Sequence, residues 1–400
     1  MIAKNKKIIV IGGGILGLSI VRNFLIEGYK NILLLEKENK IASHQSSRNS
    51  GVMHAGIYYK PNSLKAKLSR DGIFLLKEYC TKNDIRWKEC GKVIVATSEE
   101  EINLLNNLLE RGKKNKLKGI EIISSKEINS YEPYVNGKAG IIVPEESVVN
   151  YLDVANKYKE EIIALGGTIK LSAKVEEIKH SKNYEELILS TGETLKGEII
   201  IATAGLYSDK VTKKLGINID KKRIIPFKGE YYKLKPSYEY LVNGLIYPVP
   251  NPKLPFLGVH FTKMINGEVE AGPNAVLALA REGYKKGSIN LKDLYETLSY
   301  SGMQKFFLKY PITSTQELIR SLSKFFFTKS LQKLIPDIKS NMIIESSAGI
   351  RAQLMNHEGE LEQDFDIRIK KNLISILNAP SPAATSSLSI AKYIVNYLIK

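Results

Sequence analysis

Residues 8–17 read Ile8-Ile-Val-Ile-Gly-Gly-Gly-Ile-Leu-Gly17. Residues 7–11 form a continuous apolar run, which is typical of a buried parallel strand. The glycines that follow allow a tight turn, close approach of a phosphate group, and close packing of a helix on the strand. Apolar residues at helical spacing then predict a helix over 15–26, and residues 32–35 predict a second strand. The sequence therefore opens on a βαβ unit.

A carboxylate stands where this unit ends. Glu36 follows the second strand directly, at the position where an acidic side chain accepts hydrogen bonds from the ribose of a dinucleotide. The start of the helix faces the phosphate charge with its positive end. A glycine turn used for packing alone would leave Glu36 unexplained, so the sequence predicts a dinucleotide site. The contacts expected from this unit are Gly12, Gly14, Ile15, Leu16, Gly17, Glu36 and Lys37.

Two later segments favour FAD over NAD. Residues 198–205 read Glu198-Ile-Ile-Ile-Ala-Thr-Ala-Gly205 and are similar to the second strand-and-turn signature of glutathione-reductase-like FAD folds. The segment Ser347-Ala-Gly-Ile-Arg351 lies far down the chain, as in flavoproteins that close over the cofactor with a distant piece. An NAD enzyme usually keeps its nucleotide fold in one contiguous block. We therefore expect FAD.

The composition excludes several classes of protein. With 400 residues, 43% of them hydrophobic and 25% charged, the chain is long enough for two folded domains and is not a disordered protein. The two cysteines, Cys80 and Cys90, lack CxxC spacing, so we expect no metal site and a cytoplasmic location. There is no run of about 18 uncharged apolar residues that could span a membrane.

The formal net charge of +17 raises the question of an anionic partner. Basic residues are spread along the chain, and the short clusters at 111–118 and 221–223 do not alternate with aromatic residues. A stacking platform for single-stranded nucleic acid needs such aromatic residues. We therefore expect no nucleic-acid partner, although a flavin-bearing RNA-binding protein is kept as the alternative from another class.

Several stretches outside the nucleotide motifs carry a family resemblance. Residues 44–59 begin His44-Gln-Ser-Ser-Arg-Asn-Ser-Gly51, and two later stretches read Ile225-Pro-Phe-Lys-Gly-Glu-Tyr-Tyr232 and Asn378-Ala-Pro-Ser-Pro-Ala-Ala-Thr385. With residues 245–250, 256–262, 270–274 and 349–353, they resemble the L-2-hydroxyglutarate oxidases and dehydrogenases. These are flavoproteins of the D-amino-acid-oxidase-like superfamily. Residues 202–204, where some relatives carry other small residues, depart from the pattern and leave FAD binding intact.

The resemblance implies FAD-dependent oxidation of L-2-hydroxyglutarate to 2-oxoglutarate, with the electrons passed to oxygen or to a membrane quinone. No residue decides between these two acceptors. Another FAD-dependent amino-acid or glycerol-phosphate oxidoreductase is the alternative within the flavoproteins. The further FAD contacts implied are Ser46, Arg48, Asn49, Ser50, Gly51, Val175, Ala204, Gly205, Gly349, Ile350, Pro382 and Ala383.

The implied substrate has two carboxylates and a hydroxyl on the carbon that loses a hydride. A site for it needs cationic or hydroxyl donors and a base for the hydroxyl proton. Arg351 and Lys228 are the candidate carboxylate ligands, although most of the 59 lysines and arginines are expected on the surface. The other candidate substrate contacts, which could equally belong to the core or to turns, are Tyr58, Tyr247, Thr262 and Asn274.

Two of the five histidines are candidates for the base. His54 ends the loop that follows the second strand, where it could instead anchor or tether the flavin. His260 lies on a predicted strand of the substrate domain, with Thr262 facing the same way two residues on. The sequence slightly favours His54 and places both in the site.

These elements predict an α/β protein in which a Rossmann-like FAD-binding domain is interleaved with an α+β substrate domain built on an antiparallel sheet. The FAD-binding domain is expected to take residues 1–90, 150–222 and 340–400, and the substrate domain residues 91–149 and 223–339.

Residues 314–335 predict a basic amphipathic helix. Ser314 and Glu317 have capping-box spacing, and Leu318, Leu322 and Phe325 belong to an apolar stripe flanked by lysines and arginines. Such a helix could lie in a membrane surface or pack on the protein's own sheet. The first alternative would place the protein peripherally on the inner face of the cell membrane.

Overall fold

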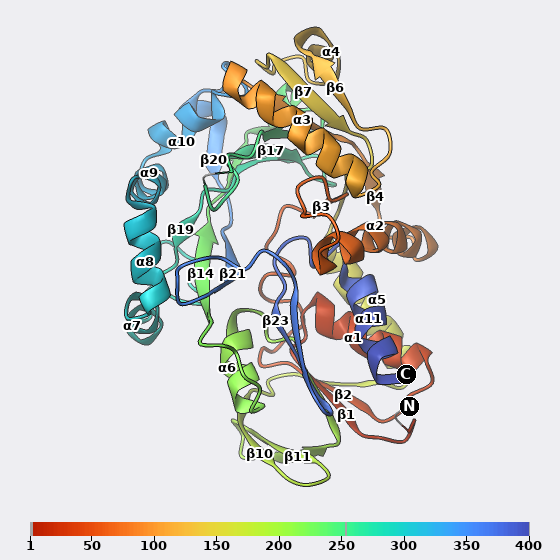
Figure 1. Ribbon diagram of the computed structural model, residues 1–400. Coiled ribbons are helices and arrows are strands. Elements are labelled where there is room, and N and C mark those ends of the chain that lie inside the picture. The colour runs from red at the N-terminus through yellow and green to blue at the C-terminus, as the bar shows by residue number, and fades with distance from the viewer. Residues whose placement is uncertain (1–2, 253, 400) are drawn as a thin grey trace.

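A six-stranded sheet lies in the lower half of the molecule as drawn in Figure 1. The structure, a computed structural model, describes residues 3–252 and 254–399. The central strand β1 (Ile8–Ile11) pairs in parallel with β2 (Ile32–Leu35) and with β13 (Ile199–Ala202). The outer strands are β9 (Thr168–Lys170), β23 (Leu373–Asn378) and the antiparallel edge strand β22 (Asp366–Lys370). The chain thus returns to this sheet from three distant segments.

Both faces of this sheet are covered, which explains the unbroken apolar sequences of its strands. On one face, Ile8 and Val10 pack under three helices: α1 (Ile15–Ile26), α5 (Tyr151–Ala164) and α11 (Ser387–Ile399). On the other face, Ile9 and Ile11 pack against α6 (Ser208–Lys214) and a small antiparallel sheet. The strands of that small sheet are β10 (Val175–His180), β11 (Glu185–Leu189) and β12 (Thr194–Gly197).

A second, eight-stranded sheet lies above the first (Figure 1). In spatial order its strands are β20 (Ile343–Glu345), β15 (Tyr232–Leu234), β18 (Val269–Gly272), β17 (His260–Lys263), β16 (Leu245–Pro248), β5 (Lys92–Ala96), β7 (Ala139–Val143) and β6 (Glu121–Ser124). The pairs are antiparallel except for β16 with β5. Its remote end carries α3 (Glu99–Lys114) and α4 (Ser125–Tyr131). The mixed α/β fold predicted from the sequence is confirmed.

Two small sheets join these layers. In one, β14 (Arg223–Gly229) pairs with β21 (Gly349–Met355) and with β19 (Val276–Leu277). In the other, β8 (Ser147–Val149) lies between β3 (Val52–Met53) and β4 (Trp87–Glu89), next to the long helix α2 (Leu64–Lys82). Segments remote in sequence therefore meet between the two large sheets.

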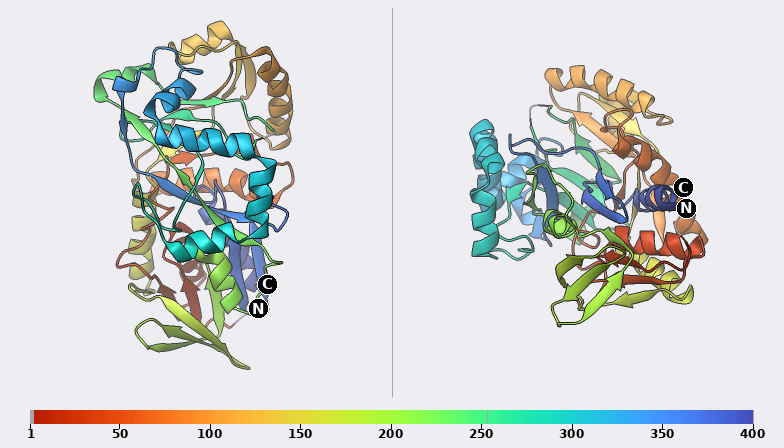
Figure 2. Two further views of the ribbon diagram at one scale, coloured as in Figure 1. Left: turned by 90° about the vertical axis from the view of Figure 1, so that its left-hand side faces the viewer. Right: turned by 60° about the horizontal axis from the view of Figure 1, so that its bottom comes forward.

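Four consecutive helices form an outer layer (Figure 2). They are α7 (Leu291–Leu298), α8 (Ser301–Lys309), α9 (Pro311–Leu322) and α10 (Lys324–Leu331). The single helix predicted over 314–335 is wrong, because Ser323 is extended (φ −130°, ψ 110°) and separates α9 from α10. The predicted cap at Ser314 is also wrong. The helix begins three residues earlier at Pro311, whose fixed φ suits a first helical position.

The apolar stripe of this region is divided between the core and the surface. Phe327, Leu331 and Ile335 belong to the core beneath the eight-stranded sheet. Leu322 and Phe325, by contrast, are 79% and 57% exposed. Within the described residues, no helix has the length and apolar character needed to cross a membrane.

Candidate active site

A cavity of about 1080 Å³ lies between the carboxyl edge of the first sheet and the second sheet. Its lining includes the residues that follow β1, β2 and β13, the place where open α/β sheets bind their ligands. It continues to Tyr247 on β16, His260 on β17 and Arg351 on β21. This volume is at the upper end of the range for small-molecule sites, as a long cofactor with a substrate beside it would require.

Each glycine of the first turn has its own structural reason. Gly12 has φ +110°, and a Cβ there would lie 2.5 Å from the carbonyl oxygen of Thr203. A Cβ at Gly17 would lie 2.0 Å from the carbonyl oxygen of Gly12, so this glycine brings α1 onto β1 and does not line the cavity. At Gly14 a Cβ would meet only Ser46 Oγ, at 3.2 Å. Gly14 therefore leaves space on the cavity side, where a pyrophosphate could approach.

Glu36 is held at the end of β2 by the backbone. One carboxylate oxygen accepts from Gly13 N at 2.6 Å, and the other accepts from Glu38 N at 2.9 Å. The side chain lines the cavity while 7% of the residue is exposed. A fixed carboxylate next to a glycine turn suits the ribose of a dinucleotide.

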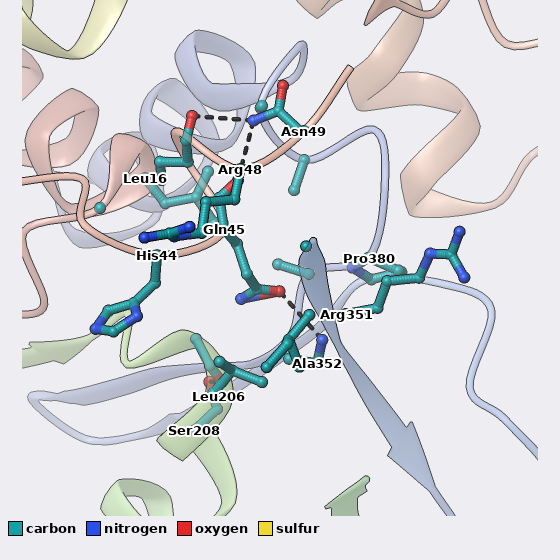
Figure 3. Close-up of a pocket in the computed structure, with 18 of the residues that line it drawn as sticks. Leu16, His44, Gln45, Arg48, Asn49, Leu206, Ser208, Arg351, Ala352 and Pro380 are labelled. Atoms are coloured by element: carbon teal, nitrogen blue, oxygen red, sulfur yellow. Dashed lines mark hydrogen bonds between the residues drawn. The ribbon is translucent and has the colours of Figure 1, made fainter. Parts of the chain in front are cut away.

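The loop after β2 is fixed by its own polar side chains. Ser46 Oγ accepts from Ile15 N at 2.9 Å, and Asn49 Nδ2 donates to the carbonyls of Gln45 and Ser46, at 3.0 Å each. Gln45 Oε1 in turn accepts from Ala352 N at 3.1 Å, which ties the loop to β21 (Figure 3). The loop thus bridges the first sheet and β21, which includes part of the distant segment 347–351 that predicted FAD.

Most of the predicted cofactor residues come together around this one cavity. Those that line it are Gly12, Gly14, Ile15, Leu16, Glu36, Lys37, Ser46, Arg48, Asn49, Ser50, Gly51, Val175, Ala204, Gly205, Gly349, Ile350, Pro382 and Ala383. The open face at Gly14, the fixed carboxylate of Glu36 and the length of the cavity fit FAD.

His54 lines the same cavity next to a buried ion pair. Its Nδ1 lies 3.2 Å from Glu146 Oε2 and 3.3 Å from Lys92 Nζ. Lys92 and Glu146 are 2.8 Å apart, and their side chains are 0% and 1% exposed. Burial alone would raise the pKa of Glu146, but Lys92 and His54 lower it to about 2. Glu146 is therefore a carboxylate at neutral pH.

His260 has a different environment. Its ring stacks on Tyr247, with ring centroids 3.9 Å apart, and its Nδ1 lies 3.1 Å from the carbonyl oxygen of Gly258. Because that carbonyl is an acceptor, Nδ1 carries the proton in the neutral ring. Burial, with a smaller contribution from Arg351, lowers the pKa of His260 to about 3. His260 is therefore neutral at physiological pH and is a weak base.

Arg351 and Lys65 are two of the cationic side chains that line the cavity. Arg351 donates to the carbonyl oxygen of Asn274 at 3.4 Å, and its guanidinium lies 5.6 Å from the centre of the Phe256 ring. Lys65, in the first turn of α2, donates to the carbonyl oxygen of Gln363 at 3.0 Å. Burial lowers the pKa of Lys65 to about 8, while Asp364 opposes the shift. Both groups are available to an anionic ligand.

Three predicted substrate contacts are not among the residues that line the cavity. Lys228 is buried and lies 3.4 Å from Glu230. Asn274 is buried and bonds through both side-chain atoms to Glu230. Thr262 is buried on the strand that carries His260. Tyr58 and Tyr247 do line the cavity.

Sequence reasoning missed Lys92, Glu146 and Lys65. A lysine at the start of the apolar strand Lys92–Ala96 is an available signal, because a charge entering a buried strand needs a partner. The sequence gives no sign that this partner is Glu146, because the two segments are brought together by the pairing of β5 with β7, in which Lys92 lies opposite Val143. Lys65 lies in an ordinary basic helical turn with no distinctive spacing.

The fold and the cavity together define a flavin-dependent oxidoreductase. The chain matches the family described as FAD dependent oxidoreductase (DAO) over residues 7–397, and it belongs to that family. FAD is its cofactor, as predicted from the sequence.

Proteins of similar sequence and solved structures of similar fold support this family assignment. The L-2-hydroxyglutarate dehydrogenase of Indibacter alkaliphilus is 49% identical over 98% of this chain and 99% of its own length. The mitochondrial L-2-hydroxyglutarate dehydrogenase of Homo sapiens is 39% identical over 97% of this chain and 88% of its own. A FAD-bound structure of L-alpha-glycerophosphate oxidase from Mycoplasma pneumoniae has a TM-score of 0.79 at 22% identity, covering 99% of this chain and 95% of that one. Glycine oxidase from Geobacillus kaustophilus has a TM-score of 0.74 at 14% identity, covering 98% and 94%.

Proposed function

We propose that this protein oxidises L-2-hydroxyglutarate to 2-oxoglutarate. The observation that carries the proposal is that one cavity is lined by the dinucleotide turn, by His54 and His260, and by cations that include Arg351 and Lys65. A 2-hydroxy acid with a second carboxylate is a small molecule that could use all of these groups. The sequence similarity to proteins named L-2-hydroxyglutarate dehydrogenase supports the same substrate.

In this proposal the chain's residues divide into three roles. The residues around Gly14 and Glu36 hold FAD, which accepts the hydride from C2 of the substrate when it is bound. Arg351 and Lys65 bind the two carboxylates, and the hydroxyl of Tyr58, buried without a partner among the described residues, is a further donor. His54 takes the hydroxyl proton. The O–H and C2–H bonds break as the C2 carbonyl forms.

His54 is a better base than His260 on two grounds. Protonation of His260 is opposed by burial and by Arg351, which lower its pKa to about 3. Protonation of His54 places a positive charge 3.2 Å from the Glu146 carboxylate. We therefore assign His260 to hydrogen bonding of the substrate and His54 to proton transfer.

A substrate panel tests this function. Dye-coupled turnover should be measured with L-2-hydroxyglutarate, D-2-hydroxyglutarate, L-lactate, glycine and glycerol 3-phosphate. We expect the L-dicarboxylate to have the highest kcat/KM. A higher value for glycine or for glycerol 3-phosphate would support the alternative oxidoreductases instead.

We also propose that the predicted domain division describes how the chain builds this site. Residues 1–90, 150–222 and 340–400 supply all the strands of the first sheet, which supports their assignment to FAD binding. Residues 91–149 and 223–339 supply seven of the eight strands of the second sheet, the exception being β20 (Ile343–Glu345). The substrate would then lie between the two domains.

We further propose that the outer helices contact an anionic membrane peripherally, where a quinone could take the electrons. Exposed apolar side chains recur along this layer, and the exposed Lys309, Lys329 and Lys333 lie among them. Apolar side chains flanked by cations suit an anionic bilayer surface. The exposed apolar residues are Leu291, Tyr295, Leu308, Ile312, Leu318, Leu322, Phe325 and Phe326.

A further inference from the structure

The buried pair of Lys92 and Glu146 needs an explanation beyond stability. Moving each charge out of water costs several kcal/mol, and well-packed apolar residues in their place would often be as stable. The pair nevertheless lies against His54, which lines the cavity, and its two side chains are 0% and 1% exposed. Lys92 also lies 4.4 Å from the centre of the Tyr247 ring, whose hydroxyl-bearing side chain lines the cavity.

Both charges face the same ring nitrogen of His54. Nδ1 lies 3.2 Å from Glu146 Oε2 and 3.3 Å from Lys92 Nζ. A carboxylate can only accept and an ammonium can only donate, so Nδ1 can bond with one of them at a time. If Lys92 were the partner, the lone pairs of Nδ1 and Oε2 would face each other across 3.2 Å. If Glu146 is the partner, Nδ1 carries the proton and Lys92 remains bound to Oε1.

We propose that Lys92 and Glu146 are positioning residues that hold His54 as the Nδ1–H tautomer, so that Nε2 presents its lone pair to the substrate hydroxyl. The hydroxyl proton moves to Nε2, and the resulting imidazolium forms an ion pair with Glu146, whose Oε2 lies 3.2 Å from Nδ1. That the substrate hydroxyl donates this proton rests on the function proposed above. The tautomer of His54 is independent of that function, because the two buried charges fix it before any ligand binds.

Lys92 and Glu146 have opposite effects on the pKa of His54, and therefore on the pH above which His54 can accept a proton. Burial is the main cause that lowers the pKa of His54; Lys92 lowers it further, and Glu146 raises it. Lys65 on α2 adds a smaller lowering. The remaining titratable neighbours are uncharged near neutral pH, since burial raises the pKa of each tyrosine and lowers that of His260. They are Tyr58, Tyr59, Tyr247 and His260.

Single substitutions should therefore move the pH profile in opposite directions. In Lys92→Met, the unopposed carboxylate should raise the pKa of His54, and the acid limb of the flavin-reduction rate should move up by about one pH unit or more. In Glu146→Gln, the unopposed lysine should move that limb down. The plateau rate at high pH should also fall about tenfold or more, because the tautomer is no longer fixed. Stopped-flow reduction under anaerobic conditions measures both quantities.

A spectroscopic measurement removes the dependence on substrate. In the 15N spectrum of the substrate-free holoenzyme, His54 should show a protonated Nδ1 and a bare Nε2, with the signals assigned by their loss in His54→Gln. Glu146→Gln should abolish this preference. If L-2-hydroxyglutarate fails to reduce the native flavin, the proposed function fails, while this spectrum still tests the tautomer.

Two further variants separate positioning from stability. Arg281→Met/Asp209→Leu removes the other buried ion pair of the described chain with a 2.8 Å contact, and it should leave the acid limb and the spectrum unchanged. Lys92→Met/Glu146→Leu should fold even where a single variant does not, because no lone charge is left buried. It should show the reduced plateau with an unaltered KM. Equal rate losses at every pH in both single variants, or a native His54 protonated on Nε2, would overturn the proposal.

Discussion

The missing side chain of Gly14 is needed for FAD binding rather than for the folding of the protein. Its backbone (φ −75°, ψ 175°) is open to any residue, and a Cβ would meet only Ser46 Oγ. We expect Gly14→Val to fold with an unchanged circular dichroism spectrum while FAD occupancy falls at least about tenfold, as measured by the ratio of flavin to protein absorbance.

Gly12 provides the contrasting case. A Cβ there would lie 2.5 Å from the carbonyl oxygen of Thr203, in a backbone of φ +110°. Gly12→Ala should therefore lower the melting temperature of the protein itself. Full flavin occupancy in Gly14→Val would mean that the pyrophosphate does not approach this turn.

Arg351 and Lys228 give a matched pair of cations, since only Arg351 lines the cavity. A charge-assisted hydrogen bond to a carboxylate contributes about 1.5–3 kcal/mol, so Arg351→Ala should lower kcat/KM for L-2-hydroxyglutarate about 10- to 150-fold. Lys228→Ala should alter stability through Glu230 without such a selective loss. Equal losses in steady-state assays of the two variants would remove Arg351 from carboxylate binding.

Among individual residues, those that belong to local motifs could be predicted from the sequence. Gly12, Gly14 and Glu36 lie within one βαβ unit, so their positions follow from local geometry. Lys228 and Asn274 have motif-like neighbours, but neither is among the residues that line the cavity. Predicting which side of β14 faces the site needs its pairing with β21, and that pairing joins residues more than a hundred positions apart.

Among the elements, the segment between β19 and α7 is tied to α6 by Arg281. Its guanidinium bonds to both carboxylate oxygens of Asp209 on α6, at 2.8 and 2.9 Å, and is buried. Arg281→Met would leave Asp209 buried without its cation, which costs about 3–5 kcal/mol. We expect a melting temperature several degrees lower in calorimetry, with much of the loss recovered in Arg281→Met/Asp209→Leu. An unchanged melting temperature in the single variant would show that the pair does not stabilise this junction.

The outer helices carry the membrane proposal. Leu322→Ser/Phe325→Ser/Lys329→Glu removes exposed apolar and basic groups without touching Phe327, which is core. We expect the native protein to co-sediment with anionic liposomes, to be partly released by salt, and to bind neutral ones less. The triple variant should lose this binding. Ile163→Ser/Leu165→Ser, with comparably exposed residues around the end of α5, should keep it. Equal pelleting of the native protein and the triple variant would contradict the contact.

The break at Ser323 shows why the helical pattern was misread. Apolar residues continue at helical spacing across it, so periodicity alone predicts one helix. Tertiary packing decides otherwise, because Phe327 and Leu331 must enter the core while α9 stays outside with none of its residues buried. Pro311 at the start of α9 is a local signal that could have corrected the predicted cap.

For the whole molecule, the α/β class could be predicted from a contiguous nucleotide motif, and the flavin from the two later segments 198–205 and 347–351. The order of the eight-stranded sheet could not, since its strands come from four separated stretches of chain and include one parallel pair. The same long-range pairing brings Lys92 to Glu146 and so completes the site around His54.

We expect this cavity to pass a hydride from L-2-hydroxyglutarate to FAD. The most direct measurement is an anaerobic titration of the purified holoenzyme, with flavin absorbance and the product followed together. We predict that L-2-hydroxyglutarate bleaches the flavin with one 2-oxoglutarate formed per FAD reduced, and that the D-enantiomer does not. A flavin that stays oxidised with excess L-2-hydroxyglutarate, yet is bleached by glycine or glycerol 3-phosphate, would show that L-2-hydroxyglutarate is not the substrate.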